Sequence, residues 1–149
     1  MPETFSDSLG MRLRRAYLAL HRRTNAELRK GFGATADQFV VMTLLAEQSP
    51  ASQQELAARC GSDASTMGAL VRLLETKGWV RRTPDPSDRR AWQVRLTRTG
   101  RGLQTRMARA AEQSFHRDLW SVLDSARSEK AVLRALDQIA GRMNGEGRQ

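Results

Sequence analysis

Cysteine, histidine and long apolar segments are scarce in this sequence of 149 residues, and each scarcity excludes a class of protein. The single cysteine, Cys60, cannot form an internal disulfide and is typical of a reducing compartment. Because free cysteine is among the most buried residue types, we interpret Cys60 as a small apolar core residue. With His21 and His116 as the only histidines, the sequence offers no compact set of zinc ligands.

Catalytic and membrane signatures are missing as well. The sequence shows no combination of nucleophile, base and orienting group and no phosphate-binding glycine loop. We therefore expect no catalytic residue, metal or cofactor, and interpret the chain as a non-enzyme. No apolar run is long enough to cross a bilayer, and the first fifteen residues lack the apolar region of a secretion signal. These absences predict a cytoplasmic protein without a membrane partner.

Acidic residues are also in deficit, with 16 Asp and Glu against 25 Lys and Arg, which gives a formal net charge of +9. The positive charge is concentrated in two segments. Residues 12–30 contain seven basic residues and one acidic residue, and residues 81–106 contain eight arginines and two aspartates. Such concentration predicts a polyanionic partner, with nucleic acid ahead of a membrane surface.

Apolar residues at helical spacing predict long helices at both ends of the chain. The first runs over residues 9–28 and is followed by two glycines, which are stop signals. Towards the other end, Thr97 is the predicted N-cap of a long helix that reaches Val122. A last helix is predicted after Ser128, with its apolar residues on one face.

Two capping boxes mark helix starts between these long helices: Thr35 with Gln38, and Ser52 with Glu55. The first opens a helix that is nearly all apolar, which indicates a central position in the fold. The second opens a short helix that Gly61 ends.

A further helix follows this short one after only three residues, 61–63, and stops at Gly78, a predicted C-cap position. Its apolar residues repeat at i, i+3, i+4 and i+7, namely Met67, Leu70, Val71 and Leu74. Two short helices joined by a tight turn that contains glycine are the signature of a helix-turn-helix.

Two strands are predicted next, over residues 79–83 and 91–97, with the polar turn D-P-S-D-R-R at residues 85–90 between them. The turn makes this segment a hairpin whose tip carries arginines. Asp88 stands beside Arg89 and Arg90, and a carboxylate beside a guanidinium can hold the long side chain extended, which suits a narrow minor groove. A turn with solvated charges is the alternative interpretation, because the tripeptide D-x-R is common.

The helix after residue 63 has a polar face opposite its apolar one. On a helical wheel this face consists of Ser65, Ala69, Arg72 and Thr76, and we expect it to meet the major groove of DNA. Serine can bond to a base edge or a phosphate, an alanine methyl can pack on a thymine methyl, and Gly68 lets the backbone come close. An ordinary solvated helix face is the alternative.

The order and spacing of these motifs resemble the MarR family of winged helix-turn-helix regulators, over most of the chain. Three segments carry the resemblance: D-A-S-T-M-G-A-L-V-R-L-L-E-T-K-G-W-V-R-R at 63–82, D-P-S-D-R-R-A at 85–91 and V-R-L-T-R-T-G at 94–100. The resemblance implies a homodimer joined through the first, fifth and sixth helices, which binds a pseudo-palindromic operator in double-stranded DNA.

The resemblance also implies which residues meet DNA or an effector. The expected DNA contacts are Ser65, Thr66, Gly68, Ala69 and Arg72 on the recognition helix, Ser52, Gln53 and Gln54 on the helix before it, and Asp88, Arg89 and Arg90 on the wing. Family members often bind aromatic or phenolic molecules between the first, second and fifth helices. The corresponding candidates here are Tyr17, His21, Phe39, Met42 and Trp120, for which core or dimer packing is the alternative.

The sequence departs from the family pattern at two places. Gly68 and Ala69 stand where many members carry Thr and Arg for base contacts, so specificity is expected to lean on the wing and on DNA shape. Cys60 lies on the third predicted helix rather than near the start of the first, where peroxide-sensing members hold their reactive thiol. The pattern therefore gives no support to redox sensing.

The sequence as a whole predicts a mainly helical fold with a β wing, a winged helix-turn-helix with long terminal dimerisation helices. We expect one domain over 1–149, with a DNA-binding lobe at 35–100 and a dimerisation region formed by 5–30 and 101–145. The predicted function is sequence-specific DNA binding by a transcription repressor that a small aromatic effector releases. A non-specific architectural nucleic-acid-binding protein and a ligand-binding module that no longer binds DNA are the alternatives.

Overall fold

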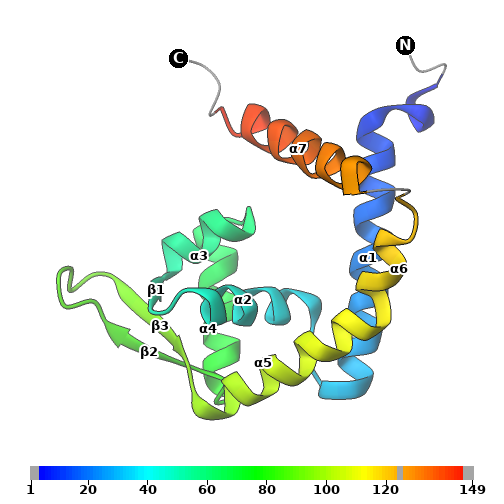
Figure 1. Ribbon diagram of the computed structural model, residues 1–149. Coiled ribbons are helices and arrows are strands. Elements are labelled where there is room, and N and C mark those ends of the chain that lie inside the picture. The colour runs from blue at the N-terminus through cyan, green and yellow to red at the C-terminus, as the bar shows by residue number, and fades with distance from the viewer. Residues whose placement is uncertain (1–3, 124–125, 146–149) are drawn as a thin grey trace. The chain divides into compact units, whose positions relative to one another are not determined.

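The computed structural model describes residues 4–123 and 126–145, and the chain divides into two compact units, residues 1–110 and 111–149. Figure 1 labels the elements along the chain. The first unit begins with a 3₁₀ turn, Phe5–Asp7, and continues with α1 (Leu9–Phe32), α2 (Ala36–Glu47), β1 (Ala51–Ser52), α3 (Gln53–Cys60), α4 (Ala64–Thr76), β2 (Val80–Pro84), β3 (Trp92–Leu96) and α5 (Arg98–Ala111). The second contains a π-helical turn, Glu112–His116, α6 (Arg117–Trp120) and α7 (Ala126–Met143).

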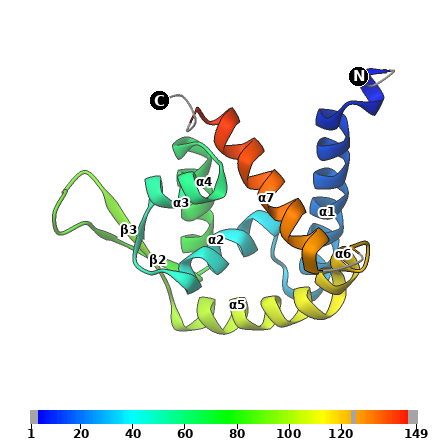
Figure 2. The same cartoon turned by 45° about the horizontal axis from the view of Figure 1, so that its top comes forward.

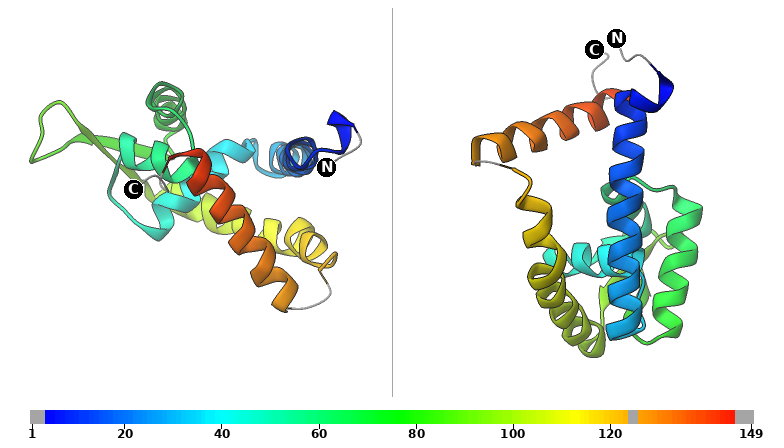
Figure 3. Two further views of the ribbon diagram at one scale, coloured as in Figure 1. Left: turned by 90° about the horizontal axis from the view of Figure 1, so that it is seen from above. Right: turned by 90° about the vertical axis from the view of Figure 1, so that its right-hand side faces the viewer.

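The predicted fold class is confirmed, because helices dominate and a small antiparallel sheet forms a wing. The strand order is β1-β3-β2, with Val80 opposite Leu96 in the hairpin. The third strand, β1, escaped the sequence analysis because it is only two residues long; it pairs Ala51 with Val94. In Figure 1, Figure 2 and the left view of Figure 3, the end of the β2–β3 hairpin extends beyond α2, α3 and α4.

Both predicted capping boxes are present. The Thr35 side chain accepts from the backbone N–H of Gln38, and the backbone N–H of Thr35 donates to the Gln38 side chain. Ser52 and Glu55 form the same two bonds. Gly33 and Gly61 end α1 and α3 in the left-handed conformation. These four helix ends form as predicted because all the groups involved lie within a few residues of one another.

The hydrophobic core of the first unit joins all of its helices to its sheet. As predicted, α2 is central, with Val41, Met42 and Leu45 at 1% exposure or less. The cluster includes Leu28 from α1, Leu56 from α3, Met67, Val71 and Leu74 from α4, Val80 and Val94 from the sheet, and Leu103 and Met107 from α5. This packing fixes α3 and α4 against each other and against the base of the hairpin.

The start of α5 lies directly against the start of the hairpin. Thr97 caps α5 by accepting from the N–H of Gly100, as predicted, and its own N–H donates to the carbonyl of Trp79 over 3.0 Å. A Cβ on Gly100 would lie 1.9 Å from that same Trp79 oxygen. No side chain larger than hydrogen fits this position, so glycine is what allows α5 to leave the sheet at this point.

Several predicted boundaries were wrong by one to three residues. The strands begin at Val80 and Trp92 rather than one residue earlier, and α7 begins at Ala126, before Ser128 rather than after it. The C-cap residue of α4 is Lys77, and Gly78 adopts the left-handed conformation one residue later. The helix predicted to run to Val122 is interrupted by the π-helical turn. Fraying and short-range competition among hydrogen bonds decide such ends, and residue type alone does not.

Apolar side chains on the long helices are only partly covered. In α1 the buried residues, Thr24 and Leu28, lie near its C-terminal end, whereas Leu9 is 63% exposed. In α7 the predicted apolar face is present, but most of it is exposed in the single chain: Val132, Leu133, Leu136 and Met143.

Candidate nucleic-acid interface

The recognition helix, α4, is held at its N-terminus by Asp63. One oxygen of this carboxylate accepts from the backbone N–H of Thr66 and the other from its hydroxyl, each over 2.8 Å. These bonds lower the pKa of Asp63 below its ordinary value, because they favour the charged carboxylate. The Thr66 hydroxyl was predicted to meet DNA; in the structure its hydrogen is committed to the cap.

The exposed face of α4 contains Ser65, Ala69 and Arg72, which we call the reading face. All three residues are exposed, as the helical wheel predicts. Thr76 is also exposed, but its hydroxyl donates to the carbonyl of Arg72 one turn earlier. Gly68 differs from the prediction: it is buried, so its backbone is not open to a close approach by DNA. The only long side chain of the reading face is Arg72.

The predicted contacts on α3 have unequal access. Ser52 serves as the N-cap, accepting from Glu55 N–H over 3.1 Å, while its own N–H donates to the Glu55 carboxylate over 2.6 Å. These bonds lower the pKa of Glu55. Gln53 is half-buried, and Gln54 is exposed. The structure therefore presents Gln54 directly and makes Ser52 chiefly a capping residue.

The wing tip, residues 85–90, is built by two aspartates that bond to the local backbone. Asp85 accepts from the backbone N–H and hydroxyl of Ser87, which lowers its pKa, and Asp88 accepts from the N–H of Arg90 over 2.9 Å. The expectation that Asp88 holds a guanidinium was therefore wrong, because its carboxylate shapes the turn instead. Arg89 and Arg90 are exposed at the tip.

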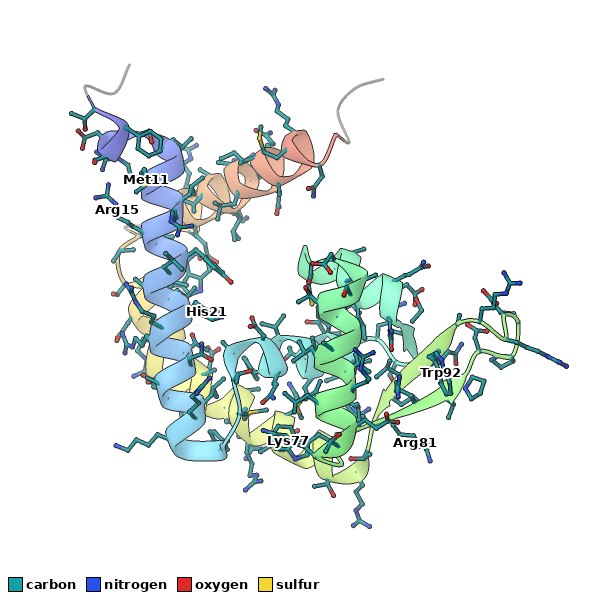
Figure 4. The ribbon with its side chains drawn as sticks, turned by 180° about the vertical axis from the view of Figure 1, so that it is seen from behind. Met11, Arg15, His21, Lys77, Arg81 and Trp92 are labelled. Carbon is teal, nitrogen blue, oxygen red and sulfur yellow. The ribbon has the colours of Figure 1, made fainter. Side chains whose placement is uncertain are left out.

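The base of the wing is fastened to the recognition helix. Glu75 of α4 accepts from the Nε of Arg82 over 2.8 Å and from the backbone N–H of the same residue over 3.3 Å. The Arg82 guanidinium also lies 5.2 Å from the ring centre of Trp92, which Figure 4 labels on the hairpin. Sequence analysis missed this contact, because seven residues and a change from helix to strand separate the partners.

Lys77, the C-cap residue of α4, fastens the same end of the helix to α1 (Figure 4). Its ammonium donates to the carbonyl of Gly33 over 3.0 Å and lies 4.4 Å from the ring centre of Trp79. The C-terminus of α4 is thus tied to the corner between α1 and α2. Together, Glu75 and Lys77 fix the recognition helix relative to the wing and to α1 within the first unit.

A pair of arginines lies at the base of the wing on its solvent side. Arg81 and Arg95 are directly opposite each other in the β2–β3 register, and both are exposed. Like charges directly opposite each other in a sheet are destabilising. A partner with negative charge would relieve this repulsion.

Comparison with known proteins places this architecture in a family. The model of the MarR family matches residues 34–92. The repressor NicR of Pseudomonas putida is 37% identical over 79 residues, which are 53% of this chain and 50% of that protein. The regulator TtmR of Methylorubrum extorquens is 37% identical over 49% of this chain and 37% of its own length. The chain thus spans about half the length, or less, of these two curated relatives.

Solved structures are similar over nearly the whole chain. The transcriptional repressor CouR, bound to a 23-mer DNA duplex, superposes with a TM-score of 0.81 at 28% identity, covering 94% of this chain and 97% of that one. BpsR of Bordetella bronchiseptica gives a TM-score of 0.78 at 29% identity and covers 94% and 98%.

Residues 34–92 of the chain match the MarR family, and the fold is that of a solved MarR-family regulator from Rhodococcus, with a TM-score of 0.79 at 28% identity over 93% of this chain and 96% of that one. The segment that matches the MarR model extends from the end of α1 through the wing tip to Trp92, so it contains the reading face and the tip together. No helix in the described part of the chain is long and apolar enough to span a membrane.

The predicted effector residues are only partly brought together. Tyr17 and His21 are neighbours on α1, with ring centres 5.6 Å apart, and His21 Nε2 lies 3.3 Å from the Asp37 carboxylate (Figure 4). Met42 is completely buried in the core of the first unit, and Trp120 belongs to the second unit. Met42 is therefore core, which was the alternative interpretation.

Phe39 and Cys60 are partly buried and pack against the same core. Burial raises the pKa of the Cys60 thiol, so the unreactive, protonated form is favoured. Cys60 is thus less buried than predicted, yet its environment is apolar, as expected for a packing residue.

Proposed function

We propose that this protein is a sequence-specific DNA-binding transcription regulator, and that it acts as a repressor on a pseudo-palindromic operator. The observation that carries the proposal is that one lobe presents two elements suited to the two grooves of DNA. The reading face of α4 has the dimensions for a major groove, and the exposed Arg89 and Arg90 at the wing tip suit a minor groove. CouR, which has the same fold, is bound to DNA in its structure.

Charge supports a duplex as the partner. Four arginines of the wing, Arg89 and Arg90 at the tip and the pair Arg81 and Arg95 at its base, lie on the same hairpin and are exposed. Their contacts with phosphates would supply affinity without sequence information, while the reading face would supply the choice of bases. No catalytic step belongs to this proposal, and the protein would act in the cytoplasm, where the chromosome of a bacterial cell is accessible.

We further propose a homodimer, with residues 5–30 and 101–145 as the dimerisation region and 35–100 as the DNA-binding lobe. The exposed apolar face of α7 supports this assignment, because a second copy of the chain would remove that face from water. Two lobes related by a twofold axis would place their recognition helices in successive major grooves.

Release by a small aromatic effector is the remaining part of the proposal. The BpsR structure is described as explaining regulation of DNA binding by 6-hydroxynicotinic acid. In this chain the exposed Tyr17, whose ring is tilted against that of His21, offers a surface for an aromatic molecule. Effector binding would favour a dimer in which the two reading heads are wrongly spaced.

Selection of binding sites from a random pool of DNA duplexes tests the function most directly. A palindromic consensus is expected, with half-sites about one helical turn apart. The selected duplex is then competed with random duplex and with RNA. Equal competition by all three nucleic acids would favour the architectural alternative, and absence of any binding would favour a ligand-binding module of this fold.

A further inference from the structure

Two polar side chains cover Gly68, the buried glycine in the middle of the recognition helix. A methyl group added to its Cα would lie 3.5 Å from Nε2 of Gln53, which comes from α3, and 3.5 Å from Nη1 of Arg72, one turn further along α4. The two polar atoms thus lie within twice that distance of each other. Glycine leaves bare backbone at this place, and the side chains of two different helices meet over it.

The amide of Gln53 lacks one hydrogen bond. Its Oε1 is buried and has no partner among the described residues. An unpaired buried carbonyl oxygen is unfavourable, whereas the guanidinium of Arg72 has five donors and no acceptor. A half-turn of the terminal amide exchanges Oε1 with Nε2, so that the oxygen lies 3.5 Å from the Gly68 methyl position, the same distance as Nη1 of Arg72.

We propose that Gln53 and Arg72 form one specificity-determining pair across Gly68. The Gln53 oxygen accepts from the Arg72 guanidinium and fixes its direction, and the oriented guanidinium donates to O6 and N7 of a guanine in the major groove. Arginine with both of these acceptors is the commonest specific base contact, and it depends on a fixed geometry of the fork. This inference rests on the proposed DNA-binding function.

The small neighbours of Arg72 strengthen the assignment. Ser65 and Ala69, the other members of the reading face, have short side chains and cannot reach a base edge as far from the helix as arginine can. Within the described part of the chain, no carboxylate forms an ion pair with the guanidinium of Arg72, since Glu75 bonds to Arg82. Base selection by α4 therefore depends on where the single long side chain points.

The test uses the full chain and a duplex selected by the wild-type protein from a random pool. Affinity is measured for that duplex and for copies in which guanine is replaced by 7-deazaguanine, which lacks the N7 acceptor. Each copy carries the replacement at the two guanines that the palindrome relates to each other. The proteins are wild type, Gln53→Leu, Arg72→Leu and the double variant. At one guanine position the wild type is expected to lose about tenfold in affinity and Arg72→Leu to lose nothing.

The coupling between the two side chains decides the inference. Gln53→Leu should lose most of the preference for that guanine, and the double variant should bind no more weakly than Arg72→Leu alone. The proposed pair would be overturned if the affinity losses of the two single variants multiply in the double variant. It would also be overturned if Gln53→Leu retained the preference for guanine.

Three further variants separate base reading from folding. Ala58→Leu alters an exposed position on α3 outside the expected DNA contacts and should keep the preference. Gly68→Ala should also keep it, because its methyl lies at ordinary contact distance, whereas Gly68→Leu should abolish it by displacing both side chains. Gln53→Leu should melt no lower than wild type, because the buried end of the Gln53 amide has no hydrogen-bond partner among the described residues; a lower melting temperature would make Gln53 a structural residue.

The experiment also distinguishes this inference from the function on which it rests. If the wild-type protein selects no consensus, the proposed function fails and the inference fails with it. If it selects a consensus in which no guanine depends on Arg72, only the inference fails.

Discussion

At the scale of single residues, the structure shows which arginines have a free charge to offer. Arg82 is held by Glu75, and Arg59 by Glu47 and the carbonyl of Leu44. Arg90, in contrast, has only its backbone N–H engaged, by Asp88. A guanidinium that is exposed and unpaired can displace a counterion from DNA, and this is the property that a salt titration measures.

We expect Arg90→Ala to weaken binding to the selected duplex and to reduce the salt-dependence slope by about one, because one phosphate contact is lost. Filter binding or fluorescence anisotropy between low and moderate salt measures both quantities. Arg14→Ala, at an exposed position on α1, is the matched control and should leave the slope unchanged. An unaltered slope in Arg90→Ala would remove Arg90 from the interface.

At the scale of elements, the junction between the wing and α5 makes two neighbouring glycines behave in opposite ways. A methyl on Gly100 would lie 1.9 Å from the Trp79 carbonyl oxygen, whereas a methyl on Gly102, two residues further along α5 and exposed, would meet nothing within 4 Å. The first substitution forces backbone apart, whereas the second only improves helix propensity.

Gly100→Ala is therefore expected to destabilise the protein by about 3 kcal/mol, the upper end of the usual cost of overpacking. Gly102→Ala should stabilise it by about 1 kcal/mol. Urea unfolding followed by circular dichroism measures both values. Equal effects of the two substitutions would contradict the close approach at Gly100.

The recognition helix gives a second element-scale prediction through its cap, Asp63. Its folded pKa is lowered from an ordinary value of 3.8 by the two bonds from Thr66. A lowered folded pKa means that the cap stabilises the fold above the unfolded pKa, and that this stabilisation is lost as the pH falls through the folded pKa. Protonation removes the charge that the Thr66 donors and the helix dipole favour.

Asp63→Asn keeps an acceptor but does not titrate. Its unfolding free energy is therefore expected to fall less steeply than that of the wild type below about pH 4, the region just under the unfolded pKa. Thermal unfolding monitored by circular dichroism over a series of acid pH values gives the two slopes. Asp118→Asn, a change in the second unit, is the control; slopes that coincide for wild type and Asp63→Asn would refute the role of the cap.

These elements also show what sequence can predict and why. The capping boxes, Gly33 and Gly61 were predicted correctly, because each depends on residues within four positions of one another. The strand β1 was not, because its two residues acquire strand character only by pairing with β3. The bond from Glu75 to Arg82 likewise needs the folded wing.

The candidate site divides in the same way. The helical wheel identified Ser65, Ala69 and Arg72 as exposed, because one face of an amphipathic helix follows from spacing alone. The wheel placed Gly68 near the same face and could not show that Gln53 covers it, because that side chain arrives from another helix. The Asp88 carboxylate was predicted to bind a guanidinium rather than the backbone, because the sequence shows which residues are adjacent but not where their side chains point.

At the scale of the whole molecule, α7 carries a set of apolar side chains that are exposed in the single chain. The exposed apolar residues of α7 recur at positions 132, 133, 136 and 143, and Leu136 is 43% exposed. A helix with so much apolar surface in the single chain needs a partner surface, and in a symmetric dimer each copy supplies one. Dimerisation would then fix the spacing of the two reading faces, so that assembly and DNA affinity are coupled.

Leu136→Lys places a charge in the middle of this apolar face and should shift the protein towards monomer, because an unpaired buried ammonium is strongly unfavourable. Sedimentation velocity measures the shift. Gln138→Lys adds the same charge about 200° around the helix from position 136, at an exposed position, and should leave the dimer intact.

The monomer should keep the fold of residues 1–110, whose core lies in that unit, and yet lose tight binding to the palindromic duplex, because each half-site then binds alone. A Leu136→Lys protein that sediments as wild type would place the dimer contact elsewhere; one that is monomeric and still binds the full site as tightly would show that the two lobes read DNA independently.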